Sequence, residues 1–188
     1  TKDAALITLM STTMNEAPPA QAPAQQRDFG PRFDPMPKSE TYIFTVVAYD
    51  FLPKFEQKDP TTGETKIFDA LQFYFGTIVD GKAYFLKPWP SKYSIHEKAG
   101  YTKLYRAIKG SAPLPGSNPK ELLGGGITIE VNNEAKVSKK GTPYTASRAK
   151  SYAAVHPKLK GEIVSLNALE PAFKAALEAS KKTEDAPF

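Results

Sequence analysis

The chain has 188 residues, of which 40% are hydrophobic and 24% charged, a composition typical of one globular domain with flexible extensions. It contains no Cys and two His, which argues against disulfide frameworks, thiolate zinc sites, catalytic cysteines and most His-based hydrolytic chemistry. The formal net charge is +5. Neither a signal-like start nor an apolar run of about twenty residues indicates export or membrane spanning, so we expect a protein of the reducing cytoplasm.

The positive charge is concentrated in the middle of the chain. Residues 1–40 carry a net charge of −1, residues 41–161 carry +8 and residues 162–188 carry −2. The middle segment also holds 17 of the 21 aromatic residues. A basic body that is rich in rings therefore lies between two mildly acidic ends.

Residues 1–40 are predicted to form a flexible arm rich in Pro, Ala and Gln. Six prolines precede position 40, and so much Pro among small polar residues cannot bury enough apolar area to offset chain entropy. Residues 4–10 are compatible with a short helix or strand, or with a frayed terminus. We expect one folded domain over residues 41–161, followed by a C-terminal helix and a short acidic tail over residues 162–188.

Three strands are predicted in the first half of the body. Residues 42–49 are β-branched and aromatic, and residues 66–79 form a second long run of the same kind. The dipeptide Asp80-Gly81 is a strong hairpin signal, because both central residues of a primed turn need a positive φ. Residues 83–86 are therefore expected to return as the third strand.

The periodicity then becomes helical and later returns to that of a strand. Residues 101–108 place their apolar side chains at the i, i+3, i+4, i+7 spacing of one helical face. Residues 127–131 alternate with period two, and residues 144–155 return after a Lys-Lys-Gly tip. A closing helix is predicted over residues 167–180 from its apparent N-terminal cap and its apolar face.

The predicted order is strand, strand, strand, helix, strand, strand and a final helix. This is the element order of an OB-fold, a small barrel that binds oligonucleotides across one face, although other small β-rich domains share it. We therefore expect a mainly β protein. Its core is predicted to be a five-stranded OB-fold barrel with a helix between strands three and four, a C-terminal helix and flexible ends.

Four residues of the last predicted strand suggest a binding strip. Tyr144, Arg148, Lys150 and Tyr152 share one parity, so without a bulge they project from one face. Single-strand binding uses rings on which bases stack and cations that meet phosphates, and the strip supplies both. The alternative is that the two tyrosines belong to the core and the two cations are simply solvated.

Residues 84–93 interleave rings and cations more densely than any other stretch. Trp89 lies between two prolines, which restrict its backbone, so its ring is expected either as a stacking platform or as a packed core residue. Nearby, Phe73 and Phe75 are most simply core residues. That leaves Tyr74 outward, although the reverse register is also possible.

Three short segments carry a family resemblance. They are the helix of residues 101–108, the Leu-Leu-Gly entry into a strand at residues 121–131, and the Lys-Gly-x-x-Tyr return at residues 140–144. Together they resemble bacteriophage single-stranded DNA-binding proteins with an OB-fold. The last five residues, Glu-Asp-Ala-Pro-Phe, are similar to the acidic tip of cellular single-stranded DNA-binding proteins, with Ala186 where that tip usually has Ile.

The resemblance implies a non-catalytic protein that binds and protects single-stranded DNA, with little sequence preference, in phage replication or recombination in the host cytoplasm. We expect no cofactor, metal or membrane, and the oligomeric state stays open. A mobile acidic tail that ends in a hydrophobic residue can dock on replication or recombination proteins, or compete with DNA for the basic groove. The candidate tail residues are Glu184, Asp185, Pro187 and Phe188. The candidate DNA-binding residues are Tyr74, Lys87, Trp89, Lys92, Tyr93, Arg106, Lys139, Lys140, Tyr144, Arg148, Lys150 and Tyr152.

Other classes remain open at this point. A metal-dependent nuclease would use Asp50, Asp69 and Asp80, but these are scattered near turns and strand ends, and residues 123–126 lack the Lys of a phosphate-binding loop. A virion structural or assembly protein would also suit a Pro-rich arm before a β-domain. An RNA-binding protein of the same fold is equally compatible, because stacking and phosphate contacts do not distinguish a 2′-hydroxyl.

Overall fold

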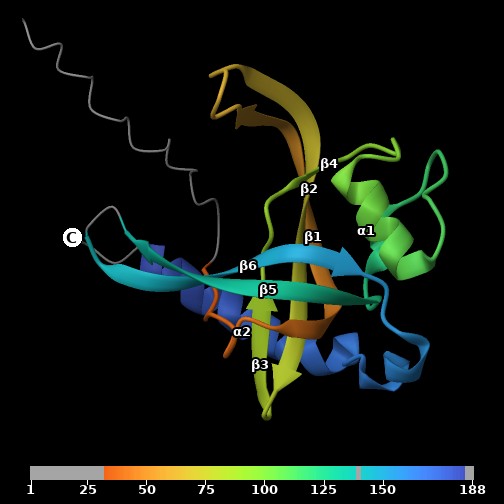
Figure 1. The fold of residues 1–188 in the computed structure, drawn as a ribbon. Coiled ribbons are helices and arrows are strands. Elements are labelled where there is room, and N and C mark those ends of the chain that lie inside the picture. The colour runs from red at the N-terminus through yellow and green to blue at the C-terminus, as the bar shows by residue number, and fades with distance from the viewer. Residues whose placement is uncertain (1–31, 139–140, 185–188) are drawn as a thin grey trace, which may run out of the picture.

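The main element of the protein is a six-stranded antiparallel sheet (Figure 1). The computed structural model describes residues 32–138 and 141–184. The order across the sheet is β3-β2-β1-β5-β6. The short β4 also pairs with β2, along the same edge as β3. The strands are β1 (Thr41–Lys58), β2 (Thr65–Val79), β3 (Lys82–Leu86), β4 (Ser91–Lys92), β5 (Gly126–Val137) and β6 (Pro143–Ala153).

Two α-helices and two short 3₁₀ helices complete the described chain. Figure 1 shows α1 beside β4 at one end of the sheet, while α2 crosses behind the strands. α1 ends at Gly110, whose left-handed φ of 79° is the expected helix stop. The helices are α1 (Gly100–Lys109), η1 (Pro119–Leu122), η2 (Pro157–Glu162) and α2 (Leu166–Glu184).

The predicted mainly β architecture with a C-terminal helix is confirmed. The short β4 is a sixth strand that the sequence did not indicate. It is separated from β3 by a stretch that contains Pro88 and Pro90, which have no N–H to donate to a ladder. Within the described ranges no ladder joins β3 to β6, so these strands are the edges of an unclosed sheet. The expected closed five-stranded barrel is not confirmed.

The two faces of the sheet carry separate hydrophobic cores. The inner face, which packs against α1, holds the larger core around Phe44, Phe73 and Phe75. The outer face is covered by α2, and there Phe173 is buried against Tyr74. Phe73 and Phe75 therefore lie in the core, as predicted.

Residues 32–40 belong to the folded body, not to a flexible arm. Met36 is 2% exposed and lies in the inner core. The ring of Phe33 contacts Phe173 of α2 at a centroid distance of 6.1 Å. The expected boundary at residue 41 is therefore wrong, because the side chains of Phe33 and Met36, just before it, pack against the sheet.

β1 and β2 are longer than predicted, and their distal halves project from the body as a two-stranded extension (Figure 1). We call β1 residues 51–58 and β2 residues 65–70 the hairpin arm. Its tip is stabilised by Asp59, whose carboxylate accepts hydrogen bonds from the amides of Thr61 and Thr62 at 2.8 and 3.1 Å. These two hydrogen bonds fix the turn that joins the two strands of the arm.

Candidate nucleic-acid interface

A β-bulge determines which side chains of the hairpin arm share a face. Leu52 lies opposite Ala70 and Phe55 lies opposite Phe68, so β1 has one residue more than β2 between these pairs. The bulge includes Lys54, which has a left-handed φ of 52°. An extra residue of this kind changes the parity of everything beyond it, so faces cannot be counted along β1 alone.

Three rings gather on the outer side of the arm. Phe55 contacts Phe68 across the strands and contacts the edge of Trp89, both at a centroid distance of 5.8 Å. Trp89 remains 39% exposed, and Lys92 Nζ lies 6.0 Å from the centre of the Phe68 ring. Trp89 is thus packed on one side and accessible on the other. It combines features of the two alternatives that its sequence allowed, a packed core residue and a stacking platform.

Two of these rings, Phe68 and Trp89, line an open groove of about 530 Å³. Its wall includes Lys66 and Lys92 as cations and Ile67, which is 62% exposed. Half-exposed rings beside cations are the two components that a stacked, charged strand needs. We define the outer groove as the surface lined by Gln57, Lys66, Ile67, Phe68, Trp89, Pro90 and Lys92.

A buried amide holds the chain that carries Trp89. Gln72 is 6% exposed, and its Nε2 donates hydrogen bonds to the carbonyl oxygens of Pro88 and Phe73 at 2.7 and 3.0 Å. The segment before Trp89 has no strand ladder, so this side chain replaces the missing backbone pairing. The indole is therefore presented on a fixed stretch of chain.

A second ring pair lies on the inner side of the arm. Phe51 and Tyr93 meet edge to face at 6.1 Å, and Tyr93 also contacts the buried ring of Tyr101 at 5.3 Å. Phe51 is 49% exposed and Tyr93 is 38% exposed. The Tyr93 hydroxyl donates to the carbonyl oxygen of Ser117 at 3.3 Å, so its ring has a defined orientation.

A bulge in β6 breaks the strip that the sequence predicts there. The pairing with β5 skips Lys150, because its neighbours Ala149 and Ser151 lie opposite the consecutive residues Val131 and Glu130. A single extra residue reverses the face that the following residues occupy. The four predicted residues therefore do not share one face.

Tyr152 is the residue that the bulge places on the inner face of the sheet. It lies opposite Ile129, which is fully buried, and its ring contacts Phe75 of the inner core at 6.2 Å. Tyr144 and Arg148 stay together on the outer face, where the register has no further shift. The prediction of one continuous strip is wrong, because it assumed a regular strand.

The two cations of β6 are paired with carboxylates of β5. Arg148 Nε lies 3.0 Å from Glu134 Oε2, and Lys150 Nζ lies 2.8 Å from Glu130 Oε1. The Lys150 hydrogen bond holds the pKa of the Glu130 carboxyl below its usual range. The positive charge of this strand is therefore largely balanced, which makes β6 a weaker phosphate-binding surface than its sequence indicates.

Tyr74 does not point outward into solvent. It is 6% exposed beneath α2, and its hydroxyl donates to Asp50 Oδ2 at 2.8 Å. Burial, and then the Asp50 hydrogen bond, raise the pKa of the Tyr74 phenol well above its usual range. Tyr74 lies on the outer face, opposite to Phe73 and Phe75, as predicted. Its predicted availability to DNA is wrong, since α2, nearly one hundred residues later in the chain, covers that face.

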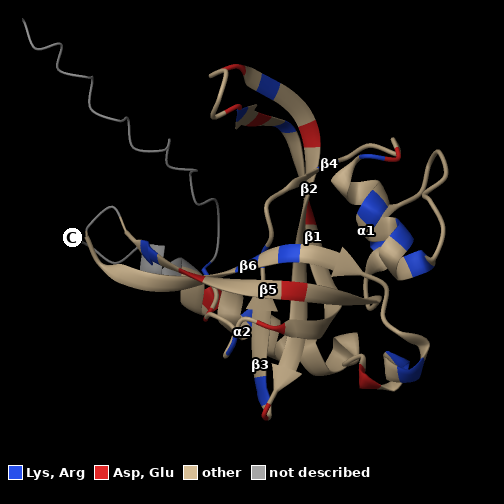
Figure 2. Cartoon of the chain, in the orientation of Figure 1, with Lys and Arg blue, Asp and Glu red and all other residues tan. Residues whose placement is uncertain are grey.

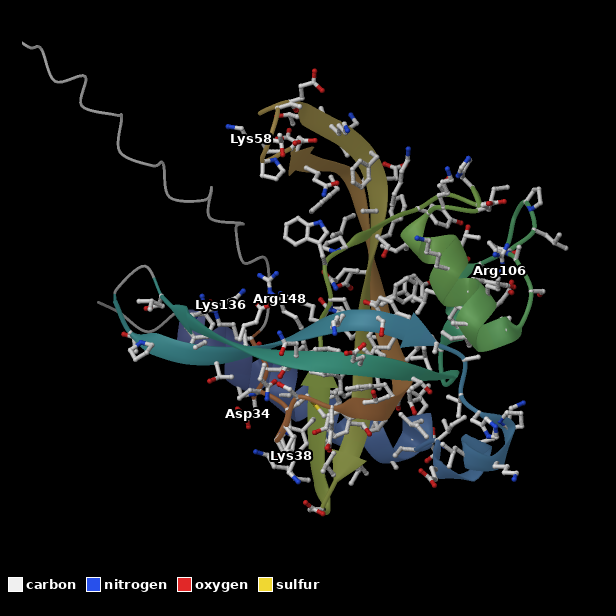
Figure 3. The ribbon with its side chains drawn as sticks, viewed as in Figure 1. Asp34, Lys38, Lys58, Arg106, Lys136 and Arg148 are labelled. Atoms are coloured by element: carbon white, nitrogen blue, oxygen red, sulfur yellow. The ribbon has the colours of Figure 1, made fainter. Side chains whose placement is uncertain are left out.

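The remaining predicted residues are dispersed. Lys87 is half-buried just after β3, and Arg106 is exposed on α1, away from the outer groove (Figure 3). The Arg32 guanidinium lies over the ring of Tyr144, 4.9 Å from its centroid. Figure 3 places Lys58 at the end of the arm and Arg148 on the β5–β6 hairpin. Lys139, Lys140, Asp185, Pro187 and Phe188 lie outside the described residues, as does the side chain of Glu184.

Charge is unevenly distributed over the elements. α1 carries Lys and Arg without Asp or Glu, whereas the hairpin arm carries both signs (Figure 2). Residues 51–70 contain three Lys and four acidic residues. The arm is thus close to neutral, and its binding capacity rests on its rings more than on net charge.

Sequence reasoning found Trp89, Lys92 and Tyr93 but missed Phe51, Phe55 and Phe68. The missed rings lie just outside the strand of residues 42–49 and at the start of the second strand. Phe51, Leu52 and Phe55 favour a strand, and they would have indicated that the first strand continues towards the turn at Asp59. Pairing across the arm then brings Phe55 and Phe68 together.

Neither a metal centre nor a membrane-spanning helix is found in the part of the chain that the structure describes. In that part, no three His, Asp or Glu side chains gather closely enough to hold a metal ion. None of its helices is long and apolar enough to cross a membrane. Comparison of the chain with protein-family models, with curated proteins and with solved structures finds no match.

Proposed function

We propose that this protein binds single-stranded DNA without catalysis and with little sequence preference, and that the strand lies in the outer groove of the hairpin arm. The observation that carries the proposal is the position of Trp89, 39% exposed, on Phe55 and beside Lys66 and Lys92. A base that stacks on an exposed aromatic ring contributes about 1–3 kcal/mol, whatever its identity. This is the basis of sequence-tolerant binding.

The architecture supports the proposal. An OB-fold is a five-stranded, partly open Greek-key barrel that binds oligonucleotides. Here five strands follow one another across the sheet from β3 to β6, β4 pairs with β2 beside this path, and α1 lies between β4 and β5 in the chain. We therefore interpret the domain as an open OB-like barrel in which the arm is an enlarged loop between the first two strands.

The biological setting in the proposal is phage replication or recombination, as the sequence resemblance implies. In this setting residues 184–188 serve as an acidic segment that docks on replication or recombination proteins. Hydrophobic residues beside acidic ones are suited to a basic pocket on such a partner.

Fluorescence anisotropy of labelled oligo-dT, titrated with the full chain at several salt concentrations, tests the proposal. Duplex DNA and oligo-U serve as competitors. Two groove cations give a slope of about −1.4 in log K against log salt, at about 0.7 per phosphate for a single strand. Preference for the duplex, or absence of binding at low salt, would overturn the proposal, and preference for oligo-U would assign the groove to RNA.

Trp89→Ala tests the groove itself. Loss of one stacked base is expected to weaken oligo-dT binding about 5- to 150-fold, which corresponds to 1–3 kcal/mol. The control is Ile78→Ala, because Ile78 is 40% exposed, as Trp89 is, but lies at the opposite end of β2. If Trp89→Ala lowers the melting temperature while leaving affinity unchanged, the ring is a packing residue and the groove is not the binding surface.

A further inference from the structure

The hairpin arm carries exposed rings on both of its sides. Phe51 lies opposite Leu71 and Phe55 lies opposite Phe68. β2 is regular in this region, so two positions that differ by an odd number lie on opposite faces. Phe51 and Tyr93 therefore form an inner pair, and the outer groove with Trp89 lies behind them on the other side of the arm.

The inner pair has the features of a second stacking surface. Phe51 is 49% exposed, and its contact with Tyr93 orients the two rings nearly perpendicular to each other, at 85°. Tyr93 in turn contacts Tyr101, which is fully buried. An exposed ring supported by a fixed one loses little conformational entropy when a base stacks on it, which favours binding.

The free edge of β1 connects the two sides. In residues 51–58 the described structure pairs β1 with β2 alone, so its other edge is open. Lys54 is exposed in the bulge between Phe51 and Phe55, and its backbone amide donates to Asp69 Oδ1 of β2 at 3.1 Å. An exposed cation thus lies between the two ring positions of β1.

We infer that Phe51 and Tyr93 form a second base-stacking site, and that a single strand passes from the outer groove around the β1 edge, past Lys54, to reach it. This inference rests on the proposed function. It also gives a reason for selectivity, since duplex DNA has a persistence length of about 50 nm and cannot turn around the edge of one strand. A flexible single strand can make this turn.

The distance between the two stacking sites determines how long an oligomer must be to occupy both. Four residues of extended chain span at most about 14 Å between Phe51 and Phe55. At about 3.4 Å per nucleotide along a stacked strand, this distance corresponds to roughly four nucleotides. The bases of a stacked four-nucleotide oligo-dT span three such steps, about 10 Å, so it should occupy one site at a time, whereas oligo-dT of twelve nucleotides should occupy both.

The experiment compares these two lengths on the full chain. Trp89 is the only Trp, so quenching of its fluorescence reports occupancy of the outer groove directly. Phe51→Ala is expected to weaken binding of the twelve-nucleotide oligomer about fivefold or more, the lower limit for one lost stack. It should leave Trp89 quenching by the four-nucleotide oligomer unchanged. Phe51→Leu, which keeps an apolar contact with Tyr93 but has no flat ring, should give the same result.

Two further variants complete the design. Lys54→Gln should reduce the salt slope for the long oligomer by about 0.7, one phosphate contact, and leave the slope for the short oligomer unchanged. Leu159→Ala, at a side chain 39% exposed on η2, is the matched control and should change neither length.

The outcomes separate the inference from the proposed function. Equal loss for both lengths, or no loss for either, in the two Phe51 variants would overturn the second site while Trp89 quenching still supports the outer groove. Absence of quenching and of anisotropy change with wild-type protein at any length would overturn the proposed function and the second site together.

Discussion

Gln72 donates a hydrogen bond through Nε2 to the carbonyl oxygen of Pro88 at 2.7 Å, one residue before Trp89. The donor is a buried side chain of β2, and the acceptor lies in a stretch without strand pairing. The buried amide of Gln72 thus positions the chain segment that carries Trp89.

Replacing Gln72 by Leu removes this hydrogen bond at nearly constant side-chain volume. We expect the free energy of unfolding to fall by about 1–3 kcal/mol, because Nε2 donates two hydrogen bonds and each contributes about 0.5–1.5 kcal/mol. We also expect the steady-state anisotropy of Trp89 fluorescence to decrease. Urea denaturation and polarised fluorescence measure the two effects. Gln57→Leu, at an exposed position of the outer groove, is the control. Unchanged Trp89 anisotropy in Gln72→Leu would show that the prolines alone fix the ring.

Lys54 adopts a left-handed backbone conformation, with φ of 52°. Glycine adopts this conformation without steric cost, whereas a β-branched residue does so poorly. We therefore expect Lys54→Gly to increase the free energy of unfolding by up to about 1 kcal/mol and Lys54→Val to decrease it by about 1–2 kcal/mol. Urea denaturation of both variants checks the prediction, and the same sign of change in both would contradict it.

Phe173 joins α2 to the outer face of the sheet. Its ring lies 5.3 Å from Phe85 and 5.4 Å from Tyr74, and its side chain is 7% exposed. Truncation to Ala is expected to cost about 3–5 kcal/mol of unfolding free energy, as for other buried rings. Lys174→Ala, at the next and exposed position, should stay within about 0.5 kcal/mol of wild type. Thermal and urea denaturation distinguish the two, and a small effect of Phe173→Ala would mean that α2 is not part of the cooperative unit.

Glu121 makes stability depend on pH. The backbone amide of Asn118, and then the Tyr105 hydroxyl, donate hydrogen bonds that lower the pKa of the Glu121 carboxyl. A pKa that is lower in the folded than in the unfolded state contributes stability above the unfolded pKa. That contribution disappears as the pH falls through the folded pKa. Glu121→Gln should therefore destabilise the protein at pH 7 but not at pH 2, as measured by urea denaturation at both pH values. An equal effect at both would contradict the charge argument.

Local patterns predicted much of the fold. The alternation of residues 127–131, the Asp80-Gly81 turn and the helical spacing of residues 101–108 each depend on neighbours in the chain, and the corresponding β5, β2–β3 and α1 elements are present. Each of these signals is complete within about ten residues, so no long-range information is needed to read it.

The site was less predictable, because three of its determinants are not local. Tyr74 is covered by a helix far along the chain, and the bulge at Lys150 moves Tyr152 to the inner face. The carboxylates that neutralise Arg148 and Lys150 come from the neighbouring strand. Parity along one strand describes a surface only when the partner strand has the same number of residues.

The bulge at Lys54 affects the bend of the arm but not the pairing of its rings. Cross-strand pairing determines which rings meet, because Phe55 stays opposite Phe68 whether or not an extra residue precedes it. The extra residue instead adds bend and twist to β1. Deleting Lys54 would therefore preserve every ring pair while straightening the arm. The angle at which the arm leaves the body can thus be altered by one residue of length, without any change to the ring pairs that it presents.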